Sequence, residues 1–422
     1  MKNFRTKVKV NNVALIRLIH QRIEERFYLF LGLLLALILS SYLLIYMFFA
    51  SPRRFAGDFY AVMYDPKWWD GTGVVYGPIV VFERWLVNAF PSLFKIEFFG
   101  FLCIALIGLS IALCIKVTQP SKSLTLIYIS VLCMNTYFLY SFSVAANPEL
   151  IELVLLLIMW WGLSNKHIKF SWFVLICAVL TKLVPVILVP LLFLYFSWSA
   201  MFLAIFTFAS ILLIVSTGQK QTIYLSISQI LDTKSTQPQP TSEQFLGLSS
   251  ALARLFGLQP SDNFIIVNNL ALCFSVLTYI SVLLLTFLIY KSQKEKSLQI
   301  KISYLFVLYL SIIPIMHLNA AHRHTFLFLA PVFVGLSYVL MSDPIILRKG
   351  KYTKILGVGF MAYSFLPIYL LDLYNFDKFL GVRFGEDVLK SALYLTEPIW
   401  LNIALVAILM LYGKSRFLSR NS

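Results

Sequence analysis

Long apolar segments alternate with short polar ones along most of this chain. Twelve apolar segments lie at 27–50, 97–115, 123–142, 148–163, 170–182, 184–197, 199–216, 264–290, 302–316, 324–341, 353–371 and 394–412. About 20 apolar residues cross the hydrocarbon core of a bilayer as a helix, and a backbone in lipid must satisfy its own hydrogen bonds. The pattern therefore predicts an all-α polytopic membrane protein, with one bundle over 27–412 of about 12 (10–12) transmembrane helices.

The region 170–197 allows two interpretations. Its two apolar stretches are each short for a crossing, and they meet at Thr181-Lys182-Leu183-Val184-Pro185. They form either two crossings or one long helix kinked at proline, and the second interpretation inverts the topology of everything downstream. The lysine-rich segments 291–301 and 348–354 favour two crossings, because they then fall on the same side as the basic N-terminus.

The composition agrees with a membrane protein. Hydrophobic residues make up 59% of the chain and charged residues 13%, and the mean hydropathy is +0.82. Most lysines and arginines fall on the predicted inner segments, which contain only four acids: Glu24, Glu25, Glu295 and Asp343. The net charge of +16 is therefore a topology signal, and it calls for no nucleic-acid partner.

This charge pattern orients the predicted bundle. The amphipathic N-terminus 1–26 and the tail 413–422 are expected in the cytoplasm, because basic flanks stay inside. The long segments 51–96, 217–263 and 372–393 are then outer loops. Functional chemistry is expected in these outer loops, since binding and catalytic residues are frequent in loops held by a rigid scaffold.

The first predicted outer loop begins with a carboxylate. Asp58 stands in the sequence Gly-Asp-Phe-Tyr at 57–60, a few residues after the first apolar segment, so it is expected at the outer mouth of the bundle. An acid in this place can act as a general base on a lipid-borne substrate. The aromatic residues Tyr60 and Tyr76 suit stacking on sugar rings. The alternative for aromatic residues here, above all Trp68 and Trp69, is an interface belt.

Cations are predicted at the same outer face. Lys182 lies between the two short segments, and His322, Arg323 and His324 share one outer turn with His317. An ammonium at a helix break, and imidazoles beside a guanidinium, suit a phosphate. The alternatives are a lysine that extends to the interface and a turn with incidental histidines. Three imidazoles without adjacent acids do not complete a zinc site, so no metal is expected.

Further polar residues are predicted near the outer face. Glu152 lies one turn after Glu149 at the start of an apolar segment, and an acid inside a membrane predicts a water-filled cavity facing the bundle interior. Gln244 and Arg254 flank an amphipathic stretch whose simplest interpretation is an interfacial helix. The chain has no P-loop, HExxH or GxSxG motif, which argues against a nucleotide-driven pump and a soluble-type hydrolase.

In their order along the chain, these features resemble the GT-C superfamily of polytopic glycosyltransferases, in particular family 87, the polyprenyl-phosphate-mannose-dependent mannosyltransferases. Asp58-Phe59-Tyr60 and Tyr76-Gly77-Pro78 match elements that follow the family's first helix. Lys182-Leu183-Val184-Pro185 matches its Lys-x-x-Pro between central helices. The stretch 243–254 and the His322-Arg323-His324 turn match its late outer loop and paired histidines, with Phe245 in place of Ser and Arg323 between the histidines.

The resemblance implies a GT-C-like bundle that transfers a sugar such as mannose from a polyprenyl-phosphate donor to a glycolipid or glycan acceptor, with inversion. Its implied residue roles are Asp58 as general base; Lys182, His322, Arg323 and His324 at the donor phosphate; and Tyr60, Tyr76, Glu152, Gln244 and Arg254 in substrate binding. It implies no cofactor, and a multi-pass protein of a bacterial plasma membrane with an extracytoplasmic site. The competing interpretations are a transporter or flippase of a lipid-linked glycan and an O-antigen polymerase or ligase.

Overall fold

The computed structural model describes residues 95–119, 149–182, 184–193, 197–218, 247–258, 264–291, 298–316, 329–341 and 398–417. Nine of the twelve predicted apolar segments fall on these ranges, and each is helical over most of its described length. The described ranges contain no strand, so the all-helical prediction is confirmed there. The segments 27–50, 123–142 and 353–371 lie outside the described residues, and the count of twelve crossings stays a prediction.

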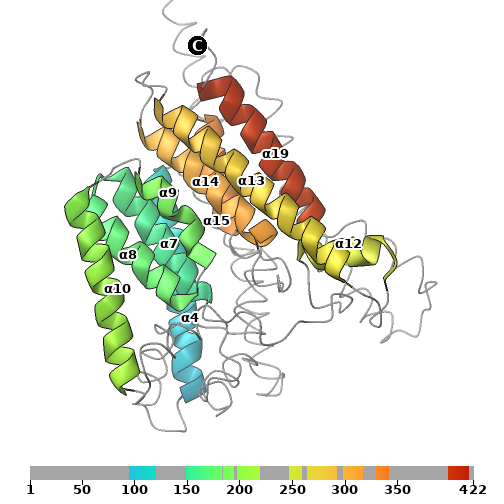
Figure 1. Ribbon diagram of the computed structural model, residues 1–422. Helices are drawn as coiled ribbons and strands as arrows, with labels where there is room; N and C mark the ends of the chain where they lie inside the picture. The colour runs from blue at the N-terminus through green and yellow to red at the C-terminus, as the bar shows by residue number, and fades with distance from the viewer. Residues whose placement is uncertain are drawn as a thin grey trace, which may run out of the picture.

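The elements follow in a simple order (Figure 1). They are α4 (Lys95–Thr118), α7 (Glu149–Ser164), α8 (Ile168–Thr181), the 3₁₀ helix η4 (Val184–Leu188), α9 (Val189–Leu192), α10 (Trp198–Gly218), α12 (Leu248–Leu255), α13 (Ile265–Lys291), α14 (Leu298–Met316), α15 (Leu329–Met341) and α19 (Pro398–Phe417). Within the described part of the chain, Ile265–Lys291 and Gln299–Met316 are long and apolar enough to cross a membrane.

Helix α14 is the centre of this bundle. It packs against α13, α15, α19 and α7, and its side chains Tyr304, Phe306 and Tyr309 are fully buried. Trp160 of α7 stacks on Phe306 with ring centroids 4.8 Å apart, and its indole N–H donates to Ser303 Oγ at 3.2 Å. These contacts join α14 to the group formed by α4, α7, α8 and α10, which lies on one side of it in Figure 1.

Polar side chains connect α14 to two of its antiparallel neighbours, α19 and α13. Toward α19, Tyr304 donates to the Leu409 carbonyl at 2.8 Å, and Asn402 Nδ2 donates to the Ser311 carbonyl at 2.7 Å. Toward α13, the hydroxyls of Thr286 and Tyr309 lie 3.1 Å apart, and Ser275 donates to the Ile315 carbonyl at 2.8 Å. Interhelical hydrogen bonds of this kind fix register where all the surrounding side chains are apolar.

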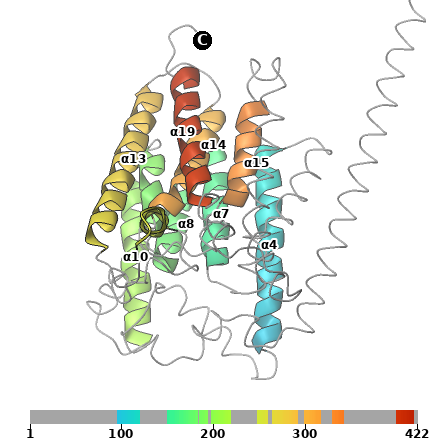
Figure 2. The ribbon, with the colours of Figure 1, turned by 90° about the vertical axis from the view of Figure 1, so that its right-hand side faces the viewer.

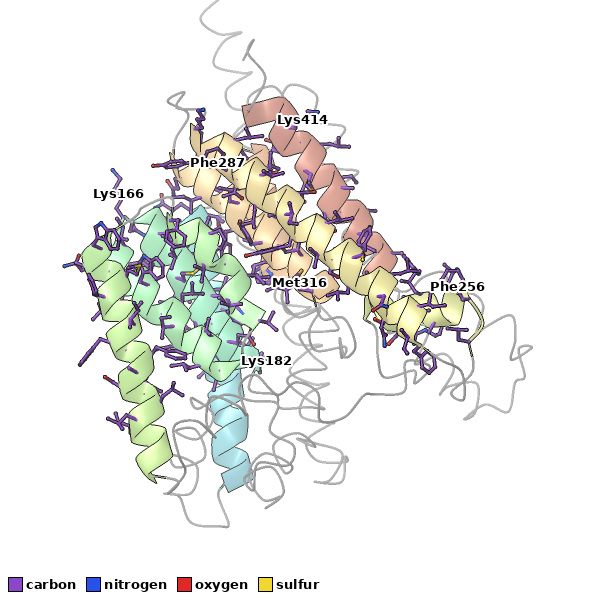
Figure 3. All side chains as sticks on the ribbon, viewed as in Figure 1. Lys166, Lys182, Phe256, Phe287, Met316 and Lys414 are labelled. Atoms are coloured by element: carbon purple, nitrogen blue, oxygen red, sulfur yellow. The ribbon has the colours of Figure 1, made fainter. Side chains whose placement is uncertain are left out.

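The two ends of the bundle differ in charge. We call them the Lys166 end and the Lys182 end, after two residues labelled in Figure 3. At the Lys166 end lie Lys116, Lys166, Lys169, Lys291, Lys301, Lys414 and Arg416. The acids within the described ranges, Glu97, Glu149 and Glu152, all lie toward the opposite end, where Lys95, Lys182 and Arg254 accompany them.

The chain reverses direction twice between α7 and α10. The first reversal is a Schellman turn: His167 N–H donates to the Gly162 carbonyl at 2.8 Å, and Lys166 N–H to the Leu163 carbonyl at 3.1 Å. Lys166 adopts the left-handed conformation that this turn requires, with φ +62°. Helix α8 then runs away from the turn, and its last residue is Thr181.

The second reversal, at Lys182, decides between the two interpretations of 170–197. Phe193 packs on Trp172 with ring centroids 5.7 Å apart, and Ser197 lies beside residues 166–170. The chain has therefore returned along α8, and one long kinked helix is excluded. Pro185 and Pro190 explain why the returning segment is not regular, because proline lacks the N–H that an α-helix interior uses. A 3₁₀ helix also rises about 2 Å per residue, so a short segment covers the length of α8.

Two helices expose large apolar side chains along their outer faces. On α13, Ile266 is 73% exposed and Leu277 64%, and on α10, Phe206 is 70% exposed and Phe202 64%. Contiguous apolar surface of this extent is unfavourable in water and is covered by a partner or by lipid. These exposed apolar faces agree with the membrane environment expected from the sequence.

Candidate functional site

Three of the predicted site residues lie within the described ranges: Glu152, Lys182 and Arg254. All three are found toward the Lys182 end. The other predicted site residues lie outside the described residues: Asp58, Tyr60, Tyr76, Gln244, His322, Arg323 and His324.

Glu152 is fully buried, at 0% exposure, on the face of α7 that packs into the bundle. The register of α7 against α8 is set near their turn, where Ser171 Oγ donates to the Met159 carbonyl at 3.4 Å. Two helical turns further along each helix, Glu152 is level with Ala178, about one turn before Lys182. A carboxylate taken out of water costs several kcal/mol unless polar groups or water solvate it. An acid at this depth is therefore expected to have polar groups or water around it.

Lys182 occupies the corner between α8 and η4. Its backbone is extended, with φ −155° and ψ 144°, and its N–H donates to the Ala178 carbonyl at 3.1 Å, so the helix ends at Thr181. The residue is half-buried. An ammonium here lies at the carbonyl end of α8, the negative end of the helix dipole, which stabilises a cation.

Helix α12 carries Arg254 and lies across the bundle. Figure 2 looks nearly along α12, while α13 runs across the view. The first turns of α12 are buried on all sides, with Leu248, Ser249, Ser250, Ala251 and Ala253, and Arg254 near the end of the helix is half-buried. A Schellman turn ends the helix, with Gly257 at φ +66° and Leu258 N–H donating to the Ala253 carbonyl at 3.0 Å. The interfacial position expected for this helix from the sequence stays a prediction.

The described site residues form two groups at this end. Figure 3 shows Lys182 and Phe256, just after α12, on opposite sides of Met316 at the end of α14. Glu152 and Lys182 therefore belong to one side of α14, and Arg254 belongs to the other. The described part of the structure does not join them into one constellation.

Two asparagines near the Lys182 end, each with a buried side-chain oxygen, were not singled out from the sequence. Asn402 is fully buried in α19 and donates to Ser311, while its Oδ1 has no hydrogen-bond partner among the described residues. Asn268, near the start of α13 beside α12, likewise has a buried Oδ1 that no described group contacts by hydrogen bond. Amides inside otherwise apolar helices were the available signal, because polar side chains in such helices are costly and often functional.

The described residues hold no group of three His, Cys, Asp or Glu side chains placed to bind a metal ion. The histidines 317, 322 and 324 are outside those ranges. Comparison of the chain with protein-family models and with curated proteins finds no match.

Proposed function

We propose that this protein is a multi-pass membrane glycosyltransferase that uses a polyprenyl-phosphate sugar as donor. The order of Asp58, Lys182, Arg254 and the 322–324 turn along the chain supports this proposal, as set out above. The observation that carries it is the placement of Glu152 and Lys182. A fully buried acid and a half-buried lysine lie at the bundle end that holds the described acids, while the opposite end holds seven described cations and no described acid.

The proposed reaction needs a base on one side of the anomeric carbon and cations on the other. Asp58 takes the proton of an acceptor hydroxyl, whose oxygen attacks the anomeric carbon with inversion. The bond from that carbon to the phosphate oxygen breaks, and the polyprenyl phosphate leaves with the electron pair. Lys182 and the 322–324 turn meet the developing negative charge, as preorganised cations do in phosphate-leaving reactions. Glu152 and Arg254 bind hydroxyl groups of the substrate.

The positive-inside rule places the Lys166 end in the cytoplasm and the Lys182 end outside. We expect a cysteine at Phe256 to react with an impermeant thiol reagent in intact cells, and one at Lys166 to react only after permeabilisation. The native cysteines 103, 114, 133, 177 and 273 are first replaced, so that only the engineered thiol reports. The reverse labelling pattern would place the proposed site in the cytoplasm and end the proposal.

The role of Lys182 is tested by donor titration. We expect Lys182→Ala to raise the donor KM by about 10–100-fold, since a charge-assisted hydrogen bond contributes roughly 1.5–3 kcal/mol. The acceptor KM should change little. Lys291→Ala, at the Lys166 end, is the matched control and should leave both constants unchanged. Combining Lys182→Ala with Arg323→Ala should cost less than the sum of the singles, because both cations act on one phosphate. An unchanged donor KM would show that Lys182 does not bind the donor and serves only to end α8.

A transporter of lipid-linked glycans is the second candidate, because a buried acid such as Glu152 is also typical of transport pathways. The two differ in product. A transferase makes a new glycosidic bond in detergent, where the two sides of a membrane no longer exist, whereas a transporter yields nothing measurable there. Sugar transfer by the native protein in detergent, with less transfer by the Glu152→Gln variant, would show that the protein is a transferase.

A further inference from the structure

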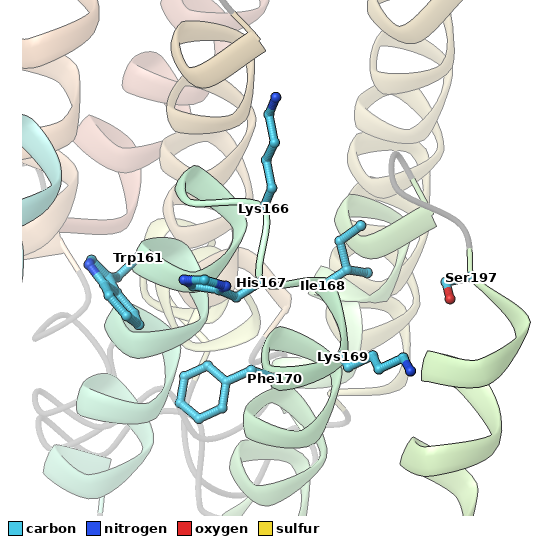
Figure 4. A pocket seen from close by; sticks show the side chains of 7 residues that line it. All are labelled: Trp161, Lys166, His167, Ile168, Lys169, Phe170 and Ser197. Carbon is cyan, nitrogen blue, oxygen red and sulfur yellow. The ribbon is translucent and has the colours of Figure 1, made fainter.

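The Lys166 end carries a hollow with an unusual combination of groups. It has a volume of about 730 Å³ and is lined by Trp161, Lys166, His167, Ile168, Lys169, Phe170 and Ser197. Figure 4 shows Trp161, His167 and Phe170 grouped on one side of the α7–α8 turn, Lys169 reaching toward the start of α10, and Lys166 extending outward from the turn. We call this feature the turn hollow.

The aromatic side of the turn hollow is ordered by ring contacts. Trp161 lies 5.6 Å from His167 and 6.4 Å from Phe170 between ring centroids, and the second pair is edge-on. Lys116, from the last turn of α4, places its ammonium 5.1 Å from the centre of the Trp161 ring. Tryptophan side chains at a membrane surface usually lie in the region between the lipid headgroups and the acyl chains.

The electrostatics of the turn hollow favour an anion. Two helices begin here, α8 at Ile168 and α10 at Trp198, and helix N-termini carry partial positive charge. Helix starts commonly have an acid in the first turn, but neither of these has one, and α8 has Lys169 there instead. His167, which precedes α8, makes no side-chain cap. Positive groups on two positive helix ends repel one another, so a bound anion lowers the free energy of this arrangement.

Apolar surface continues from the turn hollow toward the middle of the bundle. Phe170 and Phe173 are 42% and 41% exposed on one face of α8, and Phe202 and Phe206 are exposed on one face of α10. Residues three or four apart on a helix form a continuous stripe. A ligand that suits both regions has an anionic head and long apolar chains.

We propose that the turn hollow binds an anionic phospholipid, with its phosphate near Lys166, Lys169 and the starts of α8 and α10, its glycerol region on Trp161, and its acyl chains along α8 and α10. The inference rests on the membrane location proposed above and is independent of sugar transfer. Headgroup binding at this turn secures the connection between α7, which carries Glu152, and α8, which ends at Lys182.

The test uses the purified full chain in nanodiscs of zwitterionic lipid that contain brominated phosphatidylglycerol. Bromine quenches a nearby indole, so the quenching lost in Trp161→Phe reports lipid at the turn hollow. We expect Lys166→Gln with Lys169→Gln to weaken this lipid binding about 25-fold, from about fivefold per lysine near a membrane surface. Lys291→Gln with Lys414→Gln removes two cations from the same end outside the hollow and should weaken it by less than about threefold.

Three results would overturn the proposal. Equal loss in the two double variants would show general attraction of an anionic membrane to a basic end. Unchanged binding in the Lys166 and Lys169 variant would show that the hollow holds no headgroup. Displacement of the lipid by inorganic phosphate alone would identify a small-anion site. Thermal unfolding of each variant, together with the conservative Trp161→Phe, separates loss of binding from loss of fold.

Discussion

Replacing Asp58 by asparagine is expected to reduce sugar transfer by about 10²–10⁴-fold, the usual contribution of a general base. The amide has almost the shape of the carboxylate, so donor binding should persist, but it cannot accept the acceptor's proton. The measurement is the turnover of purified protein at saturating donor.

Asp65→Asn is the matched control for this change, because it removes a carboxylate from the same predicted loop seven residues away. It should keep turnover within about threefold of the native value, as a residue outside the chemical step does. Near-native turnover of folded Asp58→Asn protein would show that Asp58 is not the general base. Donor binding by Lys182 would still be tested by the donor titration.

The largest expected effect on stability is at Gly413 in α19. A Cβ at this position would overlap the hydroxyl and ring of Tyr304, which is fully buried and donates to the Leu409 carbonyl. We expect Gly413→Ala to lower the free energy of unfolding by about 1–3 kcal/mol, the range for overpacked cores. Thermal unfolding in detergent measures it.

Two further variants make this stability test specific. Gly108→Ala adds the same methyl group in α4, where nothing lies within 4 Å, and it should be neutral or slightly stabilising. Tyr304→Leu shortens the side chain that the new methyl group meets. The double variant Gly413→Ala, Tyr304→Leu should therefore lose less stability than the sum of its parts. Additive losses would mean that α19 does not pack on α14 at this point.

The helix positions could be predicted well from the sequence because each helix is marked by a long run of apolar residues. Apolar segments such as 264–290 and 302–316 lie almost on α13 and α14. One boundary differs: α19 runs to Phe417, beyond the predicted 412, since Lys414 can stay helical while its charged end extends to water. The second half of 170–197 was predicted as one apolar segment, whereas prolines divide it into η4 and α9.

The site was harder to predict than the helices. The burial of Glu152 follows from its apolar neighbours, whereas the water-filled cavity that the sequence predicted beside it stays a prediction. The level of Lys182 relative to Glu152 depends on the turn at Lys166, whose left-handed residue is not glycine and so leaves no clear signal in the sequence. Asn402 could be paired with Ser311 only once α19 and α14 were placed side by side.

The unequal lengths of α8 and α10 have a consequence for depth. Both helices begin at the turn hollow, but α8 has 14 residues and α10 has 21, so α10 extends roughly 10 Å further. Figure 3 shows that α4 also extends beyond Lys182. In a flat bilayer an ammonium at that depth lies below the headgroups and is poorly hydrated. A lipid phosphate that binds Lys182 must therefore move deeper than the headgroup layer. Its hydrogen bonds to water are then replaced by hydrogen bonds to groups of the bundle.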